Sequence, residues 1–176
     1  ITSIDCPLIQ EHIKDHLEFK DILLNSIENS GAPGVDPKEW LYHENYANIT
    51  KTDYKTGSNI PYNHLVTRLS PILKSLCEQF KWAQYSVHNM WFQQYIQGSS
   101  HGYHTHTLCQ FTGVYYLELP EGSPYTEIIY PFETMPTPIK AKEGDILLFP
   151  SFIRHRAPVV QHNIRKTIIS FNVSFS

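Results

Sequence analysis

Histidine is the residue type whose spacing points most clearly to chemistry in this chain. His104 and His106 stand two positions apart in segment 99–107, which reads SSHGYHTHT. Side chains alternate between the two faces of a β-strand, so on a strand these two imidazoles project from the same side. Two neutral imidazoles at that separation are able to share a divalent metal ion. The pair alone also fits two histidines that line a polar groove or bind backbone groups.

A third histidine and an arginine follow later in the chain. His155 comes after segment 143–151 (EGDILLFPS), which reads as a turn, a buried strand and an exposed loop. Arg165 lies ten positions further on, and Thr167 lies two beyond it on the same face of the next strand. A guanidinium binds a carboxylate through two hydrogen bonds, and a hydroxyl beside it adds a third. Arg165 alone also fits an ordinary surface arginine, but the combined spacing favours a built site.

These residues resemble the signature of the Fe(II)/2-oxoglutarate-dependent oxygenases, which reads HxD/E, a distant His, and RxS/T about ten residues later. The corresponding parts here are His104–Thr105–His106, His155 and Arg165–Lys166–Thr167. Segment 111–117 (FTGVYYL) is similar to a strand of the prolyl-hydroxylase-like branch. Segments 143–151 and 169–172 resemble small oxygenase-like proteins of marine bacteria and their phages. The resemblance covers about residues 85–176.

The resemblance implies a metal centre. It implies that His104, His106 and His155 bind Fe(II), with His106 in the place of the carboxylate that the family usually has. Three neutral imidazoles leave the ion its full charge until the 2-oxoglutarate dianion arrives. Two other arrangements stay open: two histidines completed by water, and a set in which His101 takes one place. Otherwise His101, in the preceding loop, fits a role at the entrance or in support of the ligands.

The resemblance also implies a site for the co-substrate 2-oxoglutarate. Arg165 would bind its distal carboxylate, with Thr167 beside it. Tyr116 would add a hydroxyl to the same carboxylate, although it also fits a core tyrosine. Tyr95 would reach the other side of the co-substrate, although a structural role fits it slightly better. Asn172 is a further candidate for the pocket.

The expected function is hydroxylation of a peptide side chain or a small metabolite, using Fe(II), 2-oxoglutarate and O2 and releasing succinate and CO2. Resemblance to prolyl hydroxylases favours a peptide side chain, with small metabolites almost equally suitable. A three-histidine cupin that oxidises a small thiol without 2-oxoglutarate is one alternative, which suits the ligand set but leaves Arg165 and Thr167 unexplained. A non-catalytic jelly-roll binding protein is the other.

The elements that must position these residues change character near residue 84. Apolar residues recur at helical spacing over 7–29 and 64–81, and the segment 34–61 between them is polar and reads as a loop. From residue 84 onward, period-two alternation and regular turn residues predict short strands. The expected strands are 86–96, 103–107, 112–119, 127–130, 138–140, 145–149, 152–158 and 166–175.

These elements predict one α+β domain over residues 1–176. Its core, 84–176, is a double-stranded β-helix (jelly-roll, cupin-like), and region 1–83 supports it with helices packed on one face. The composition, with 41% hydrophobic and 18% charged residues, fits a globular domain.

The charge, the apolar runs and the cysteines limit the partners and the location. A net charge of -3 without a basic run argues against nucleic-acid and membrane-surface partners. The apolar runs are too short to span a bilayer. Three widely spaced cysteines form neither a disulfide framework nor a CxxC pair, which favours a reducing, cytoplasmic location.

Overall fold

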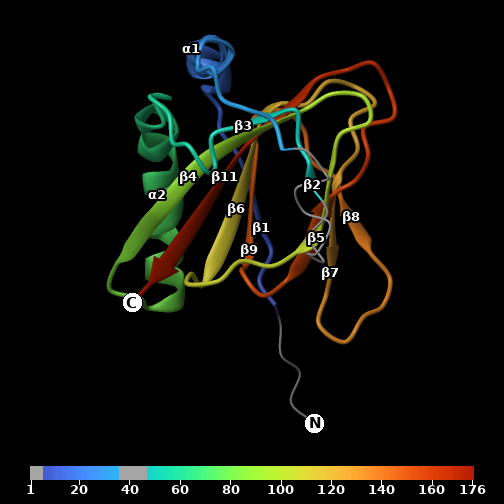
Figure 1. The fold of residues 1–176 in the computed structure, drawn as a ribbon. Coiled ribbons are helices and arrows are strands. Elements are labelled where there is room, and N and C mark those ends of the chain that lie inside the picture. Colours follow the sequence, from blue (N-terminus) through green and yellow to red (C-terminus); the bar gives the residue numbers. More distant parts are fainter. Residues whose placement is uncertain (1–5, 36–46) are drawn as a thin grey trace.

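The computed structural model describes residues 6–35 and 47–176. Two antiparallel sheets face each other in this part of the chain (Figure 1). The larger sheet has the strand order β1-β9-β6-β11-β4-β3, and the smaller has β2-β5-β10-β7-β8. The strands are β1 (Ile9–His12), β2 (Ala47–Asn48), β3 (Lys51–Thr52), β4 (Tyr85–Tyr95), β5 (Ser100–His104), β6 (Phe111–Glu118), β7 (Thr126–Ile129), β8 (Thr137–Ile139), β9 (Asp145–Pro150), β10 (Arg154–Ala157) and β11 (Lys166–Phe175).

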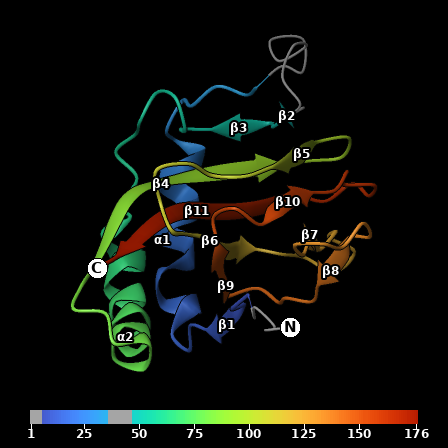
Figure 2. The same ribbon diagram turned by 90° about the horizontal axis from the view of Figure 1, so that it is seen from below.

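Two helices, α1 (His16–Glu28) and α2 (Asn63–Phe80), lie on the side of the larger sheet that faces away from the smaller one (Figures 1 and 2). Alternation along β6 builds the two resulting layers. Tyr115 packs in the cluster that contains the helix residues Phe19 and Leu69. Its neighbours Val114 and Tyr116 pack in a second cluster, between the sheets. The predicted jelly-roll core with helices on one face is confirmed.

The first part of the chain differs from its prediction in two places. Segment 7–29 begins as strand β1, which pairs with β9, and the helix starts only at His16. Gln10 and His12 both bind the Asp145 side chain, so tertiary hydrogen bonds outweigh the helical spacing there. The expected loop 34–61 contributes β2 and β3, and its residues 36–46 lie outside the described part. Neither described helix is long and apolar enough to cross a membrane.

Gly113 on β6 is required by the packing of the helix-side core. It lies opposite Phe171 of β11, and a Cβ atom at Gly113 would lie 2.1 Å from Cζ of that ring. We expect Gly113→Ala to lower the free energy of unfolding by about 1–3 kcal/mol, because the buried ring would be forced out of its position. Urea unfolding of the two proteins measures this. Equal unfolding midpoints would contradict the packing.

Candidate active site

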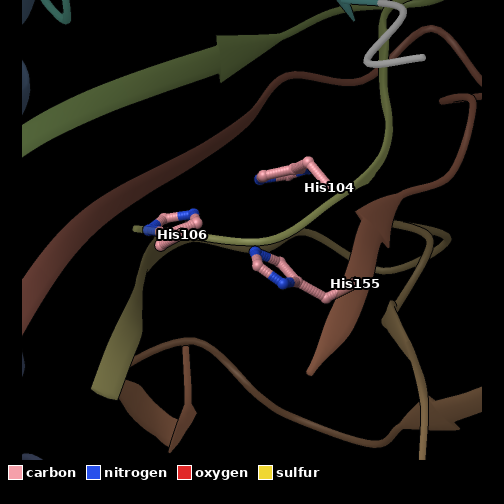
Figure 3. A group of neighbouring side chains, drawn as sticks. All are labelled: His104, His106 and His155. Carbon is pink, nitrogen blue, oxygen red and sulfur yellow. The ribbon is translucent and has the colours of Figure 1, made fainter. Parts of the chain in front are cut away.

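Three histidine side chains meet between the two sheets (Figure 3). His104 ends β5, His155 lies in β10, and His106 follows β5 by two residues. One ligand nitrogen of each ring lies within 4.8 Å of those of the other two. The ring centroids are 4.2 Å apart for His104 and His155, 5.1 Å for His106 and His155, and 5.3 Å for His104 and His106. Imidazoles from two distant segments therefore surround a volume that suits one metal ion.

The backbone positions these rings in two different ways. His104 and His155 lie opposite each other in the antiparallel ladder of β5 and β10, so both side chains point to the same face. The expected strand 103–107 ends at His104, so placing His106 on the same strand was wrong. His106 reaches the cluster from the following turn, where its backbone N–H donates to the Ser151 carbonyl at 3.0 Å.

Hydrogen bonds at Nδ1 fix the tautomer of all three rings. Nδ1 of His104 donates to the Gly102 carbonyl at 2.8 Å, and Nδ1 of His155 donates to the Ile153 carbonyl at 2.9 Å. A carbonyl only accepts, so both rings carry their proton on Nδ1. His106 donates from Nδ1 to Oδ1 of Asn172 at 2.6 Å. Each Nε2 is therefore left with a free lone pair, as a metal ligand requires.

Burial keeps these imidazoles neutral. It lowers the pKa of His104 to about 4, and it also lowers the pKa values of His106 and His155. The neighbouring imidazoles add to the lowering for His155 and His104. Neutral imidazole is the form that binds metal, so protons compete with the ion only below the usual range of histidine.

The same burial predicts how stability depends on pH in the metal-free protein. The unfolded chain protonates its histidines near pH 6.5, whereas the folded rings resist protonation until lower pH, so acid favours the unfolded chain. We expect the free energy of unfolding to fall as the pH decreases from 6.5 to 4, by roughly 3 kcal/mol from His104 alone. Urea unfolding across this range measures the fall. His104→Gln should reduce its slope, and a stability that stays constant from pH 7 to 4.5 would contradict the burial.

A cavity of about 750 Å³ contains the three histidines. Alternate residues of two neighbouring strands form one wall: Trp91, Gln93 and Tyr95 of β4, with Ile168, Ser170 and Asn172 of β11. Among the described residues that line it, none is Asp or Glu, whereas Lys55 and Arg156 are present. The Arg156 guanidinium is paired with Glu127 at 2.7 Å.

Arg165 and Thr167 lie outside this cavity. The Arg165 guanidinium donates to both carboxylate oxygens of Glu118, at 2.8 and 3.0 Å, and it also pairs with Glu28. The Thr167 hydroxyl donates to Glu118 at 2.9 Å and accepts from Gln94 at 3.2 Å. These contacts tie α1 to β6 and β11. The structure does not bring either side chain to the place where the sequence predicted a co-substrate.

Lys166, the residue between them, points the other way. It is fully buried and lies on the face of β11 that carries the cavity residues Ile168 and Ser170. Its ammonium donates to the Pro124 carbonyl at 2.8 Å and lies 5.8 Å from the centroid of the Tyr116 ring. Burial lowers the pKa of Lys166 to about 8. No described carboxylate forms an ion pair with it, and a buried unpaired cation is costly, so this position suits an incoming anion.

Two tyrosines neighbour Lys166. Tyr95 faces Lys166 across the ladder of β4 and β11, and its hydroxyl is buried without a hydrogen-bond partner among the described residues. The Tyr116 hydroxyl donates to Oγ1 of Thr126 at 2.7 Å. Tyr95 and Thr126 line the cavity. A buried hydroxyl without a partner among the described residues indicates a place for a hydrogen-bonding group from outside the chain.

Comparison with known proteins gives structural matches only. No protein-family model and no curated protein matches the sequence. A Pseudomonas putida prolyl-4-hydroxylase matches with a TM-score of 0.64 at 9% identity, over 95% of this chain and 91% of that one. A Trichoplax adhaerens prolyl hydroxylase, in complex with a hypoxia inducible factor peptide fragment, matches with a TM-score of 0.63 at 15% identity, over 95% and 83%. A 2OG-Fe(II) oxygenase family oxidoreductase from Burkholderia pseudomallei matches with a TM-score of 0.55 at 16% identity, over 66% of this chain and 57% of that one.

These matches define the class of fold. The jelly roll of this chain is similar in fold to that of a 2OG-Fe(II) oxygenase and of two prolyl hydroxylases. The resemblance seen in the sequence is thereby confirmed for the fold. The chain spans little more than half of the Burkholderia protein, so the activity has to be argued from the residues of the site.

Proposed function

We propose that this chain is an Fe(II)- and 2-oxoglutarate-dependent oxygenase that hydroxylates its substrate and releases succinate and CO2. One observation carries the proposal: three imidazole nitrogens converge in one cavity, and a buried lysine without a carboxylate partner among the described residues lies on the face of β11 that lines it. A metal and a dicarboxylate are the two ligands that such a cavity suits.

His104, His106 and His155 would hold the Fe(II). Their fixed tautomers present three nitrogen ligands, and three ligands leave other positions of the ion open for co-substrate and O2. The set fits iron without any change of hydrogen bonding, because each Nδ1 already has an acceptor. When bound, the iron supplies the oxidising chemistry with 2-oxoglutarate and O2.

Lys166 would bind the distal carboxylate of 2-oxoglutarate, in place of the role expected for Arg165. A carboxylate there would pair the buried ammonium and raise its pKa, and the Tyr95 hydroxyl would gain an acceptor. Different elements would thus hold the two ends of the co-substrate. β5, the turn after it and β10 carry the histidines at the metal end, and β11 carries the lysine at the distal end. Such fixing orients the keto acid and excludes water from the site.

The opposite, outer end of the cavity would receive the substrate. Trp91 stacks on His106 with ring centroids 5.7 Å apart, and the exposed Tyr54 lies edge-on to Trp91 at 5.1 Å. Leu108 also lines the cavity, is 97% exposed and has a φ of 62°, an uncommon backbone conformation for leucine. These apolar side chains suit a peptide side chain or a small metabolite with an apolar part. A peptide is supported by the peptide bound to the Trichoplax neighbour.

The cysteines support a reducing location. Cys6, Cys77 and Cys109 are all free thiols. Disulfides are rare in reducing compartments, so we propose that the chain works in the cytoplasm.

A thiol dioxygenase that works without 2-oxoglutarate is the second candidate. The three-histidine ligand set favours it, because no carboxylate stands among the described residues around the metal site. It would leave the buried Lys166 without a carboxylate partner. The proposed oxygenase explains both ends of the cavity.

An anaerobic titration distinguishes these functions. Fe(II) is added to the purified protein, followed by 2-oxoglutarate, and the visible spectrum is recorded before air is admitted. The proposed function predicts a weak charge-transfer band that saturates with 2-oxoglutarate, followed by succinate release in air. Absence of the band with thiol-dependent O2 uptake supports the thiol dioxygenase. Failure to retain any divalent metal supports a non-catalytic binding protein.

A further inference from the structure

A fourth histidine, His101, reaches the same cavity through an irregularity in β5. Residues three apart on a regular strand point to opposite faces. In the ladder with β10, however, His104 lies opposite His155 and His101 lies opposite Ala157, so β5 has one more residue than β10 over this stretch. A bulge of this kind turns a side chain to the other face. The His101 ring therefore lines the cavity and stacks on His104, with centroids 3.9 Å apart.

Hydrogen bonds give His101 the opposite tautomer to the three candidate ligands. Oε1 of Gln93 accepts a hydrogen bond from the Ser170 hydroxyl at 3.2 Å. The amide nitrogen of Gln93 then faces Nδ1 of His101 at 3.3 Å and donates to it. An imidazole whose Nδ1 accepts carries its proton on Nε2. The hydrogen bond of the His101 ring to the described residues is the one at Nδ1, which leaves this Nε2–H free to donate.

His101 is consequently unsuited to be a metal ligand, because one nitrogen is protonated and the other is already bonded. The described lining of the cavity offers no carboxylate that would accept from Nε2. A molecule bound beside the metal would supply such an acceptor. The bulge, the stacking and the Gln93–Ser170 pair together hold one unused donor next to the metal ligands.

We propose that His101 is a co-substrate-binding residue, whose Nε2–H donates a hydrogen bond to the carboxylate of 2-oxoglutarate that chelates the metal. The proposal rests on the metal site of the proposed function. It assigns the chelating end of the co-substrate to His101 and leaves the distal end to Lys166. A charge-assisted hydrogen bond of this kind contributes at least about a tenfold gain in affinity.

The test uses two ligands and two variants of the metal-loaded protein. Oxalate offers a carboxylate for chelation but has no distal carboxylate, so it reports on the metal end alone. Binding of oxalate and of 2-oxoglutarate to the Co(II)-loaded protein is followed by the visible spectrum without turnover. His101→Phe keeps the stacked ring and removes the donor, and His101→Gln keeps a donor. We expect His101→Phe to bind both oxalate and 2-oxoglutarate about tenfold more weakly, with unchanged affinity for Co(II). His101→Gln should recover part of the lost affinity.

Each outcome separates this inference from the proposed function. Equal affinity of His101→Phe and the unchanged protein for oxalate and 2-oxoglutarate would overturn the donor role and leave the oxygenase proposal standing. Loss of Co(II) affinity in His101→Phe would also overturn it, because support of His104 would then be the function of the ring. Oxalate binding that depends on His101, without any binding of 2-oxoglutarate, would support the donor and contradict the oxygenase. If His101→Phe does not fold, Gln93→Leu takes its place. It removes the donor to Nδ1 of His101, so the proton is no longer held on Nε2, and we expect oxalate to bind severalfold more weakly.

Discussion

Lys166→Met is expected to weaken the binding of 2-oxoglutarate to the Fe(II)-loaded protein by at least about 100-fold. Methionine retains the length of the buried stem but removes the ammonium, so the distal carboxylate would be buried without a partner, at a cost of about 3 kcal/mol or more. Lys166 is fully buried and no described carboxylate neutralises it, so its charge is available to the co-substrate. The measurement is the anaerobic titration of the charge-transfer band.

Arg165→Met is the matched control. The guanidinium already binds Glu118 and Glu28 and lies outside the cavity, so we expect the affinity for 2-oxoglutarate to change less than about threefold. The variant should instead be less stable to heat, because Glu118 and Glu28 lose their guanidinium partner and Glu118 keeps only the Thr167 hydroxyl. The opposite pattern, with 2-oxoglutarate binding lost in the arginine variant and retained in the lysine variant, would contradict the assignment of Lys166.

His106→Ala is expected to lower the affinity for Fe(II) by more than about 100-fold. Removing a partner that only orients a metal-binding histidine costs about 10- to 100-fold, and a ligand itself contributes more. Two imidazoles would remain, and no described acidic residue lines the cavity to replace the third. The measurement is competition for Fe(II) with a chelator of known affinity under anaerobic conditions.

His106→Asp separates the ligand role of this position from a packing role. An aspartate supplies a carboxylate ligand and a negative charge, which favour a divalent ion. We expect it to restore Fe(II) binding at least to the level of the unchanged protein. His106→Ala with unaltered Fe(II) affinity, or His106→Asp as weak as the alanine variant, would show that the metal is held elsewhere.

The architecture could be predicted from the sequence because most of its strands alternate regularly. Period-two alternation from residue 84 onward gave the strands of the jelly roll close to their observed bounds. Strand β1 was missed because its residues continue the helical spacing of α1, and the contacts of Gln10 and His12 with Asp145 join positions more than 130 residues apart. Such contacts leave no local pattern in the sequence.

The three histidines of the candidate site could be predicted from the sequence, but the cation that we propose, Lys166, could not. The structure brings His104, His106 and His155 together, as their spacing suggested. Arg165, the expected cation, pairs with Glu118 and Glu28, whereas Lys166, the cation that we propose, is the next residue and so lies on the opposite face of the strand. Both faces of β11 are buried, so hydrophobicity does not alternate along it and gives no sign of which face meets the cavity. The available signal was Lys166 itself, a lysine at the start of a strand that is otherwise almost entirely buried.

The role of His101 was left open for a similar physical reason. Its spacing of three from His104 places it on the other face of a regular strand, and a bulge is not visible in residue types alone. The expected strand began only at Tyr103, so His101 was taken as part of a loop, whereas it belongs to β5. The pairing of β5 with β10 in the structure shows that β5 has one extra residue there.

X-ray absorption of the Fe(II)-loaded protein, recorded anaerobically, reports on the metal centre itself, because the signal of imidazole rings counts the histidines on the ion. We expect one iron per chain with three imidazole ligands, and two imidazole ligands in His155→Ala. A spectrum with one imidazole or none, or one that is unchanged in His155→Ala, would contradict the metal centre on which the proposed function depends.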